Sequence, residues 1–224
     1  MASEKKSINS LTSGYKKFYK TYFTGNKASD FEQLVSEGQS PKTIVIACSD
    51  SRVDPAILFN AEPGSLFVVR NVANLVPPFI DIHGYPQKKY FATSAALEFA
   101  VNFLKVENIV VLGHAKCGGI ESVVNSSVQN YQDQDSFITG WMKIAHEPCQ
   151  RILESNKELS LEEKRGLCEK ECIKDSYHNL LTFPWIEDKV KRNELNIFAW
   201  YFDLENGELN QYDDKIDSWF NLNN

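Results

Sequence analysis

The sequence predicts an α/β fold, in which helices flank a central, mostly parallel β-sheet and an N-terminal helical arm precedes it. Three observations support this class. Short runs rich in Val and Ile, such as 42–49 and 108–114, are typical of buried strands. Longer segments with apolar residues at helical spacing separate such runs. Strands that alternate with helices form βα units, whose strands lie parallel in one sheet.

The first elements are expected to be two helices and two strands. Residues 8–23 are amphipathic, and 29–38 open with Ser and Asp, which cap helices well, and end on a glycine. The strand at 42–49 follows a proline, and the strand at 65–73 follows the turn sequence EPGS. Both strands are therefore bounded by residues that interrupt regular structure.

The rest of the chain continues the alternation. We expect a helix, a strand, two more helices, and a strand with a hairpin turn at ENGE, in the ranges 88–106, 108–114, 137–155, 160–183 and 195–213. Ser160 and Glu163 have the spacing of a capping box and mark the start of the last helix.

Length and composition limit the classes of protein to consider. The 224 residues suit one α/β domain, 29–224, preceded by the arm, 1–28. A net charge of −6 with a pI near 5.3 argues against a nucleic-acid partner. No run approaches the roughly 18 apolar residues of a membrane span, and the first ten residues lack the features of a secretory signal. We therefore expect a cytoplasmic protein without a membrane partner.

Three metal-ligating side chains are expected at one edge of the sheet. Cys48 ends the first strand, His114 ends the third, and Cys117 follows shortly after. Ligands of such sheets bind at the carboxyl ends of the strands. Thiolate and imidazole are favoured zinc ligands; three protein ligands leave a catalytic position open, and four make a structural site. The sequence shows no obvious fourth ligand nearby.

The other cysteines lie on predicted helices. They are Cys149, Cys168 and Cys172, and the last two are four residues apart, so that this pair could chelate a metal. Helical cysteines are more often packing residues, and we interpret the pair in that way.

Polar and small residues surround the expected metal ligands. Asp50 and Arg52 lie on the same side of an extended segment, where the guanidinium can pair with the carboxylate and fix where its oxygens point. Gly118 and Gly119 let the backbone approach a ligand and open a helix, whose first N–H groups favour an anion. These four residues are therefore candidates for the site.

Taken together, the motifs resemble those of the β-class carbonic anhydrases. CSDSR, then RNVANLVPP, then GHxxCGG occur in order, and GQSPK, PGSLFVVRN, LKVENIVVLGH and NLLTFPW are similar to the branch shared by plant and many bacterial enzymes. The resemblance runs over roughly residues 30 to 213. It implies reversible, zinc-dependent hydration of CO2 to bicarbonate and a proton, a lyase reaction in which zinc-bound hydroxide attacks CO2 in an apolar pocket.

The resemblance also assigns roles to residues. It implies one Zn²⁺ per chain on Cys48, His114 and Cys117, with Asp50 accepting a hydrogen bond from the zinc-bound water and Arg52 holding Asp50. It further implies that the substrate pocket uses an amide donor, apolar walls and the glycine pair: Gln39, Phe67, Val72, Phe99, Gly118 and Gly119. Plant members usually have tyrosine in place of Phe99, so a polar contact expected from the family is missing here.

Two further expectations concern how the site works. Two thiolates place more negative charge on zinc than three imidazoles do, so the bound water should be less acidic and the pH optimum more alkaline. Some family members close the site by moving the aspartate onto zinc, and these carry a tryptophan where this chain has Val45. We therefore expect an open site at neutral pH.

The resemblance implies a self-associating protein. Family members pair two chains, with active sites at the interface and a helical arm laid over the partner. Residues 8–23 suit such an arm, because an isolated helix of this length is marginal in water and must dock on something. The alternative is that it packs on its own domain. We expect a homodimer, or a tetramer formed through an edge strand near 196–204.

Three other functions are consistent with the same residues. Relatives with this zinc set hydrolyse carbon disulfide or carbonyl sulfide. Cys48 or Cys117 could instead be a nucleophile activated by His114. The chain could also be a non-enzymatic zinc-binding protein, which a fourth protein ligand would indicate.

Overall fold

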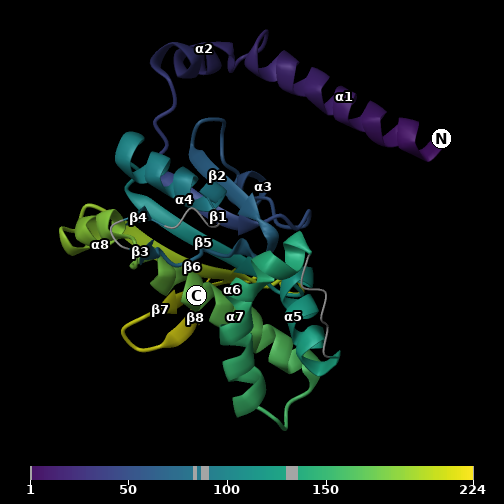
Figure 1. Cartoon of the computed structure of the whole chain (residues 1–224). Helices are drawn as coiled ribbons and strands as arrows, with labels where there is room; N and C mark the ends of the chain where they lie inside the picture. Colours follow the sequence, from purple (N-terminus) through teal and green to yellow (C-terminus); the bar gives the residue numbers. More distant parts are fainter. Residues whose placement is uncertain (1, 83–84, 87–90, 130–135, 224) are drawn as a thin grey trace. The chain divides into compact units, whose positions relative to one another are not determined.

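A computed structural model describes residues 2–82, 85–86, 91–129 and 136–223 (Figure 1). Contacts divide the chain into two compact units, Met1–Ser40 and Pro41–Asn224. The predicted boundary between residues 28 and 29 differs from this division and stays a prediction.

The first unit contains two helices, α1 (Ala2–Tyr22) and α2 (Ala28–Glu37). Aromatic rings join them: the ring centroids of Phe18 and Phe23 lie 5.8 and 4.9 Å from that of Phe31. These rings pack together at the turn that joins the two helices. The predicted helices at 8–23 and 29–38 are both present.

The start of α2 differs from the prediction, whereas its end agrees. Because the helix begins one residue earlier than expected, Lys27 is the N-cap residue, and its side chain makes no capping hydrogen bond. Ser29 and Asp30 therefore lie inside the first turn rather than capping it. Gly38 ends the helix with φ of 80°, a conformation that glycine adopts at little cost.

The second unit is built on one six-stranded sheet in its described part, with strand order β2-β1-β5-β6-β7-β8. The strands β2, β1, β5 and β6 pair in parallel, and β7 and β8 add an antiparallel edge. Their bounds are β1 Thr43–Cys48, β2 Leu66–Asn71, β5 Asn108–His114, β6 Asn196–Phe202, β7 Leu209–Asp213 and β8 Ser218–Asn221. The predicted α/β class and the hairpin turn between β6 and β7 are confirmed.

The predicted edge strand is wrong. β6 lies between β5 and β7, and within the described residues the sheet ends at β2 and β8. The hairpin after β6 folds back so that β7 pairs with residues 200–202, and β8 pairs with β7 in turn. The free backbone groups at this end of the sheet therefore belong to β8, which the sequence analysis did not identify.

The segments that connect the strands along the chain contain the helices of this unit. These helices are α3 Pro55–Leu58, α4 Phe91–Glu98, α5 Gly118–Gln129, α6 Phe137–Ser155, α7 Leu161–Leu180 and α8 Pro184–Lys191. Short segments complete the described chain: η1 Val72–Asn74, β3 Asp81–Ile82, β4 Tyr85–Pro86 and a π-helical turn, η2 Phe99–Phe103, which continues α4. The expected helix at 88–106 is thus divided, and its residues 88–90 lie outside the described ones.

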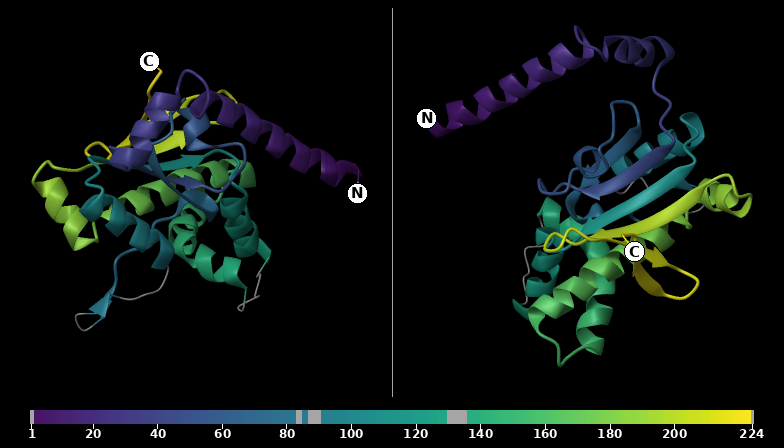
Figure 2. Two further views of the ribbon diagram at one scale, coloured as in Figure 1. Left: turned by 90° about the horizontal axis from the view of Figure 1, so that it is seen from above. Right: turned by 180° about the vertical axis from the view of Figure 1, so that it is seen from behind.

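The core sits on both faces of the parallel strands. On one face, Ile44 and Ile46 of β1 pack with residues of α4, α7 and α8. On the other, Val45 and Ala47 pack in a second apolar cluster. Figure 2 shows the same sheet from two more sides, with α7 alongside β5 and β6 and with α5 and α6 against α7. The carboxyl ends of β1 and β5, which are neighbours in the sheet, therefore meet at one edge.

Candidate metal centre

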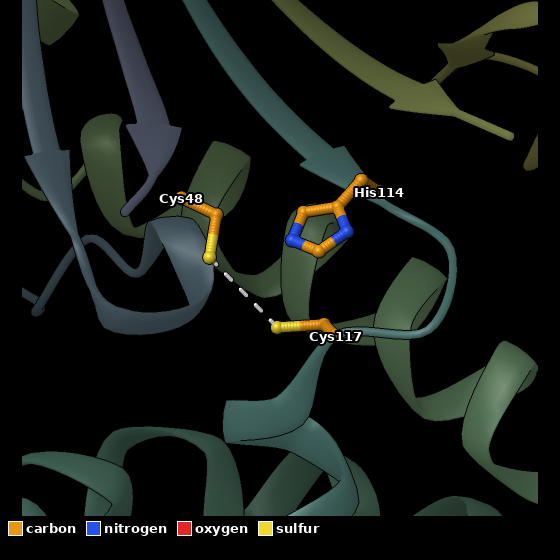
Figure 3. A group of neighbouring side chains, drawn as sticks. All are labelled: Cys48, His114 and Cys117. Atoms are coloured by element: carbon orange, nitrogen blue, oxygen red, sulfur yellow. Dashed lines mark hydrogen bonds between the residues drawn. The ribbon is translucent and has the colours of Figure 1, made fainter. Parts of the chain in front are cut away.

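Three side chains converge where β1 and β5 end. Cys48 is the last residue of β1, His114 is the last residue of β5, and Cys117 immediately precedes α5. Among the described residues, these three form the group of His, Cys, Asp or Glu whose ligand atoms all lie within 4.8 Å of one another (Figure 3). All three are buried, with exposed fractions of 5%, 1% and 2%. We refer to them as the metal group.

The imidazole of His114 points a free nitrogen into this group. Its Nδ1 lies 2.8 Å from the carbonyl oxygen of Ala115, so Nδ1 carries the proton and donates a hydrogen bond to that oxygen. Nε2 is the single buried side-chain nitrogen or oxygen of the described chain that has no hydrogen-bond partner. A buried nitrogen of this kind needs a partner, and a cation between the sulfurs would supply one.

The spacing and chemistry of the metal group fit Zn²⁺. The Cys48 and Cys117 sulfurs are 4.0 Å apart. Two sulfurs that share a tetrahedral Zn²⁺ at about 2.3 Å lie roughly 3.8 Å from each other. Two thiols and one imidazole are a donor set typical of zinc, and they leave a fourth position open.

The two thiols of the metal group differ in acidity. The pKa of Cys48 is lowered, chiefly because its sulfur accepts a hydrogen bond from Cys117, with His114 acting in the same direction. The pKa of Cys117 is raised by that same hydrogen bond and by burial. Cys48 is therefore the more acidic of the two thiols, and a bound metal would take both sulfurs as thiolates.

Asp50 and Arg52 form the ion pair that the sequence predicts. The guanidinium donates to both carboxylate oxygens, Nε to Oδ1 at 3.0 Å and Nη2 to Oδ2 at 2.7 Å. Oδ2 lies 3.9 Å from Nε2 of His114, at the border of the metal group. The hydrogen bond from Arg52 holds the pKa of Asp50 well below its usual range. This carboxylate is thus an acceptor, fixed beside the metal group by its arginine.

The turn that carries Cys117 is held from two sides. Lys116 has φ of 56°, which is uncommon for a residue other than glycine. Its carbonyl oxygen accepts a hydrogen bond from Arg52 at 3.0 Å, and the N–H of Cys117 donates to Glu169 of α7 at 2.8 Å. Arg52 thereby connects the Asp50 carboxylate to this turn.

The glycine pair begins α5, as predicted. A Cβ on Gly119 would lie 2.9 Å from a methyl group of Val72, so close packing there requires glycine. Gly118 has open space at the corresponding position. An open helix start beside the metal group suits the predicted approach of a ligand to Gly118.

Arg70 of β2 is a site residue that the sequence analysis missed. It donates to the carbonyl oxygens of Cys48, Asp50 and Val53 at 3.0, 2.7 and 3.2 Å and to the Asp54 carboxylate at 2.8 Å. This one side chain therefore holds the loop that contains both a metal-group cysteine and Asp50. The motif RNVANLVPP contains it, but only the folded chain shows what it contacts.

The predicted pocket residues are not all near the metal group. Val72 follows β2 and lines an open hollow of about 450 Å³ together with Trp141 and Phe137. Phe67 and Phe99 contact each other, with ring centroids 6.0 Å apart. In the sheet register Phe67 pairs with Ile44 and Asn71 with Cys48, which places Phe67 roughly 13 Å along the strands from that cysteine.

Gln39 belongs to the first unit, just after α2, and is exposed. Its predicted contact with substrate stays a prediction.

The remaining cysteines lie outside the metal group, although they share its buried apolar cluster. We refer to Cys149 of α6 with Cys168 and Cys172 of α7 as the helix thiol cluster. Their exposed fractions are 0%, 0% and 1%. The sulfurs of Cys149 and Cys172 are 3.8 Å apart, and Cys168 donates to the carbonyl oxygen of Cys149. They pack in an apolar cluster with residues such as Met142, so the prediction that the Cys168–Cys172 pair packs in the core is confirmed.

Comparison with known proteins agrees with this site. A family model described as carbonic anhydrase matches residues 43–209. A protein named β carbonic anhydrase 6, mitochondrial, from Arabidopsis thaliana is 43% identical over 175 residues, which are 78% of this chain and 57% of that protein. The chain thus spans little more than half the length of this curated relative.

Solved structures show the same fold. The structure of the β-carbonic anhydrase CcaA matches with a TM-score of 0.84 and 30% identity, and the match covers 96% of this chain and 92% of that one. A structure from a study of two tetrameric β-carbonic anhydrases of the ascomycete Sordaria macrospora matches with a TM-score of 0.67 and 25% identity, over 92% and 93% of the two chains.

The matched range 43–209 includes the strands that end in Cys48 and His114 and the turn that carries Cys117. The similarity therefore extends through the part of the sheet that brings these side chains together, and the chain belongs to the β class of the carbonic anhydrase family.

Proposed function

We propose that this chain catalyses the reversible hydration of CO2 to bicarbonate and a proton, with one Zn²⁺ per chain on Cys48, His114 and Cys117. The observation that carries the proposal is the unpartnered Nε2 of His114, which faces two thiol sulfurs in a buried, three-membered group. Zn²⁺ bound there would acidify a water molecule and so supply a nucleophile near neutral pH.

Asp50 and Arg52 orient the reaction in this proposal. The Asp50 carboxylate, kept ionised by Arg52, would accept a hydrogen bond from the O–H of the attacking oxygen and so direct a lone pair of that oxygen toward the carbon of CO2. Arg52 also keeps the carboxylate away from the open metal position, which leaves the site open at neutral pH. The product proton leaves to bulk water.

The substrate contacts follow the family pattern. Val72 provides an apolar wall suited to CO2, and Gly118 leaves room at the start of α5. Gln39, Phe67 and Phe99 complete the pocket in the proposal. Because Phe67 lies roughly 13 Å along the sheet from Cys48, we place it in the site of a second copy of this chain rather than in its own.

We also propose a homodimer or tetramer. Leu11 and Tyr15 on α1 are 68% and 62% exposed, and a second copy could cover them. The Sordaria macrospora relatives are described as tetrameric. Sedimentation of the intact chain, and of a truncated chain that starts at Ser29, tests this: a monomeric and fully active intact chain would contradict it.

No described helix has both the length and the apolar character needed to cross a bilayer. The cytoplasmic location remains a proposal, which fractionation of the source cells would test.

One experiment tests the proposed reaction. Zinc content and stopped-flow CO2 hydration are measured on the purified chain, with carbon disulfide hydrolysis assayed beside it. We expect one zinc per chain, rapid CO2 hydration and an alkaline optimum. A zinc-loaded chain that turns over carbon disulfide but not CO2 would show that the proposed substrate is wrong, and an active chain without zinc would favour a cysteine nucleophile.

A further inference from the structure

One carboxylate is buried in the described core. Glu169 of α7 is 3% exposed, and the other buried polar residues there are Asn74, Thr93, His114 and Ser176. It lies between Cys168 and Cys172 in sequence, on a helix face that otherwise packs against apolar residues. A carboxylate in such a place is costly unless its oxygens are well paired, so its partners indicate what it does.

Both oxygens of Glu169 are occupied. Oε1 accepts the backbone N–H of Cys117 at 2.8 Å, and Oε2 accepts the Tyr201 hydroxyl at 3.1 Å. The guanidinium of Arg165, one helical turn away, lies 3.8 Å from Oε1. Oε1 is therefore directed at the main chain of a metal-group residue and lies near Arg165, while Tyr201 holds the other oxygen.

The N–H of Cys117 has no partner within its own helix. Cys117 is the N-cap residue of α5, since its carbonyl oxygen accepts the first helical hydrogen bond, from Glu121. In a capping box, a Glu or Gln three residues later would accept the N-cap N–H. Here that position is Ile120, which cannot accept it. Glu169, 52 residues away in sequence, supplies the missing acceptor.

The turn before Cys117 also needs support. Lys116 adopts a left-handed conformation that costs energy for a residue other than glycine and persists only when its surroundings hold it. Arg52 holds the carbonyl oxygen of Lys116, and Glu169 holds the next N–H. The direction of the Cys117 side chain depends on this backbone, because Cβ follows the main chain.

We propose that Glu169 is a positioning residue for the metal: its carboxylate fixes the backbone of Cys117 so that the sulfur stays directed at Cys48 and His114, and it thereby prolongs the lifetime of the bound zinc. The proposal rests on the proposed zinc site. It assigns Glu169 no contact with substrate and no part in proton transfer.

The test compares two substitutions at this position. E169M fills a similar volume but cannot accept a hydrogen bond, whereas E169Q keeps an acceptor oxygen for the Cys117 N–H. The rate of zinc release to an excess of chelator is measured, and so is the thiolate-to-metal absorption of the Co²⁺-substituted proteins. We expect E169M to release zinc at least about 10-fold faster than the parent and to change the Co²⁺ spectrum, and E169Q to remain within about 3-fold.

A matched control separates positioning from loss of stability. Ser160→Ala removes the capping box at the start of the same helix, about two and a half turns before Glu169. The side chain of Ser160 bonds to Glu163 and not to a residue of the metal group. We expect this substitution to lower the melting temperature and leave zinc release and the Co²⁺ spectrum unchanged. Parent-like zinc release by E169M would overturn the proposal, and so would equally fast release by E169Q or by S160A.

If E169M does not fold, E169D decides the question. Asp keeps the charge but withdraws the carboxylate by one methylene, so zinc release should again be faster than in the parent, and an unchanged rate would overturn the proposal. Failure of the proposed reaction is distinguishable: a parent that holds zinc without hydrating CO2 refutes the reaction alone and leaves the zinc-release comparison intact. A parent that binds no zinc refutes both.

Discussion

The metal group and the helix thiol cluster contain all five cysteines of this chain, and every one of them is buried. They differ in what surrounds the sulfurs. Cys48 and Cys117 stand at the end of a strand and the start of a helix, beside an imidazole with a free nitrogen. Cys149, Cys168 and Cys172 lie inside two packed helices among apolar side chains. Burial alone therefore does not decide what a cysteine does.

Among the five thiols, Cys48 differs from the helix thiol cluster in acidity, whereas the pKa of Cys117 is raised like those of the helix cysteines. The hydrogen bond from Cys117 lowers the pKa of Cys48, and the nearby His114 acts in the same direction. A hydrogen bond with Cys149 and burial raise the pKa of Cys168. At Cys172 the hydrogen bond with Cys149 lowers the pKa, but burial and the neighbouring acidic groups together outweigh it, so that the pKa is raised. A metal ligand must be a thiolate, so the environment of Cys48 favours ligation and that of the helix thiol cluster opposes it, while Cys117 would lose its proton only to a bound metal.

Exchanging one cysteine for alanine in each region should give the largest contrast. C48A removes one of three zinc ligands, so we expect loss of zinc and a fall in CO2 hydration of at least about 100-fold. C149A removes a packed thiol and should keep one zinc and near-parent turnover, with a small loss of stability from the cavity. Atomic emission and stopped-flow assays measure both. Full zinc in C48A, or its loss in C149A, would abolish the distinction between the two regions.

Removal of the arginine that supports the metal group should have the next largest effect. Arg52→Ala frees the Asp50 carboxylate and one side of the Lys116 turn, so we expect hydration to fall roughly 10- to 100-fold with little change in melting temperature. Arg192→Ala is the matched control, because Arg192 is equally exposed, at 51%, and also pairs with an aspartate. Equal losses in the two variants would mean that the position of Arg52 has no special importance.

Alkylation should distinguish the two regions in the protein without metal. Because the thiolate is the reactive form, iodoacetamide at pH 6 should modify Cys48 about 10-fold faster than Cys149 or Cys172. Peptide mapping by mass spectrometry after brief exposure to a chelator measures the rates, and bound zinc should protect Cys48. Similar rates for all three cysteines would show that the difference in thiol acidity is absent in solution.

The smallest expected effect concerns stability. The pKa of Asp50 is lowered in the folded chain, so its ion pair contributes stability above the unfolded pKa of about 3.9, and this contribution is lost as the pH falls below that value. Since Arg52 is exposed, we expect D50N to cost about 1 kcal/mol or less from pH 5 to 8. Denaturant unfolding of the metal-free chain across pH 3 to 8 measures it. A larger cost would make the pair a structural element rather than a support for catalysis.

Much of the fold and of the metal group could be predicted from the sequence, because the signals are local. Runs of Val and Ile end at Cys48 and His114, and parallel strands bring their carboxyl ends to one edge. Asp50 and Arg52 are two residues apart and pair through geometry that the short segment itself provides. The capping box at Ser160 and the turn at ENGE are also local, and both are present.

Other features were decided only by the tertiary structure. β8 lies at the edge of the sheet and β6 inside it because β7 and β8 fold back beside β6. The pattern of apolar and polar residues within β6 does not reveal this position. Arg70 holds the Cys48 loop across 22 residues, and Glu169 holds Cys117 across 52. A charged residue in a helix usually faces solvent, and nothing adjacent in the sequence marks Glu169 as buried.

The division has a physical cause. Hydrogen bonds, caps and turns within a few residues depend on local backbone geometry, so the sequence by itself determined the strand ends, the Asp50–Arg52 pair and the set Cys48, His114 and Cys117. The partners of a buried charge depend on which distant element packs beside it. Only the packing of α7 against β5 and β6 placed Glu169 next to Cys117, and it left Cys168 and Cys172 outside the metal group although they belong to the same buried cluster.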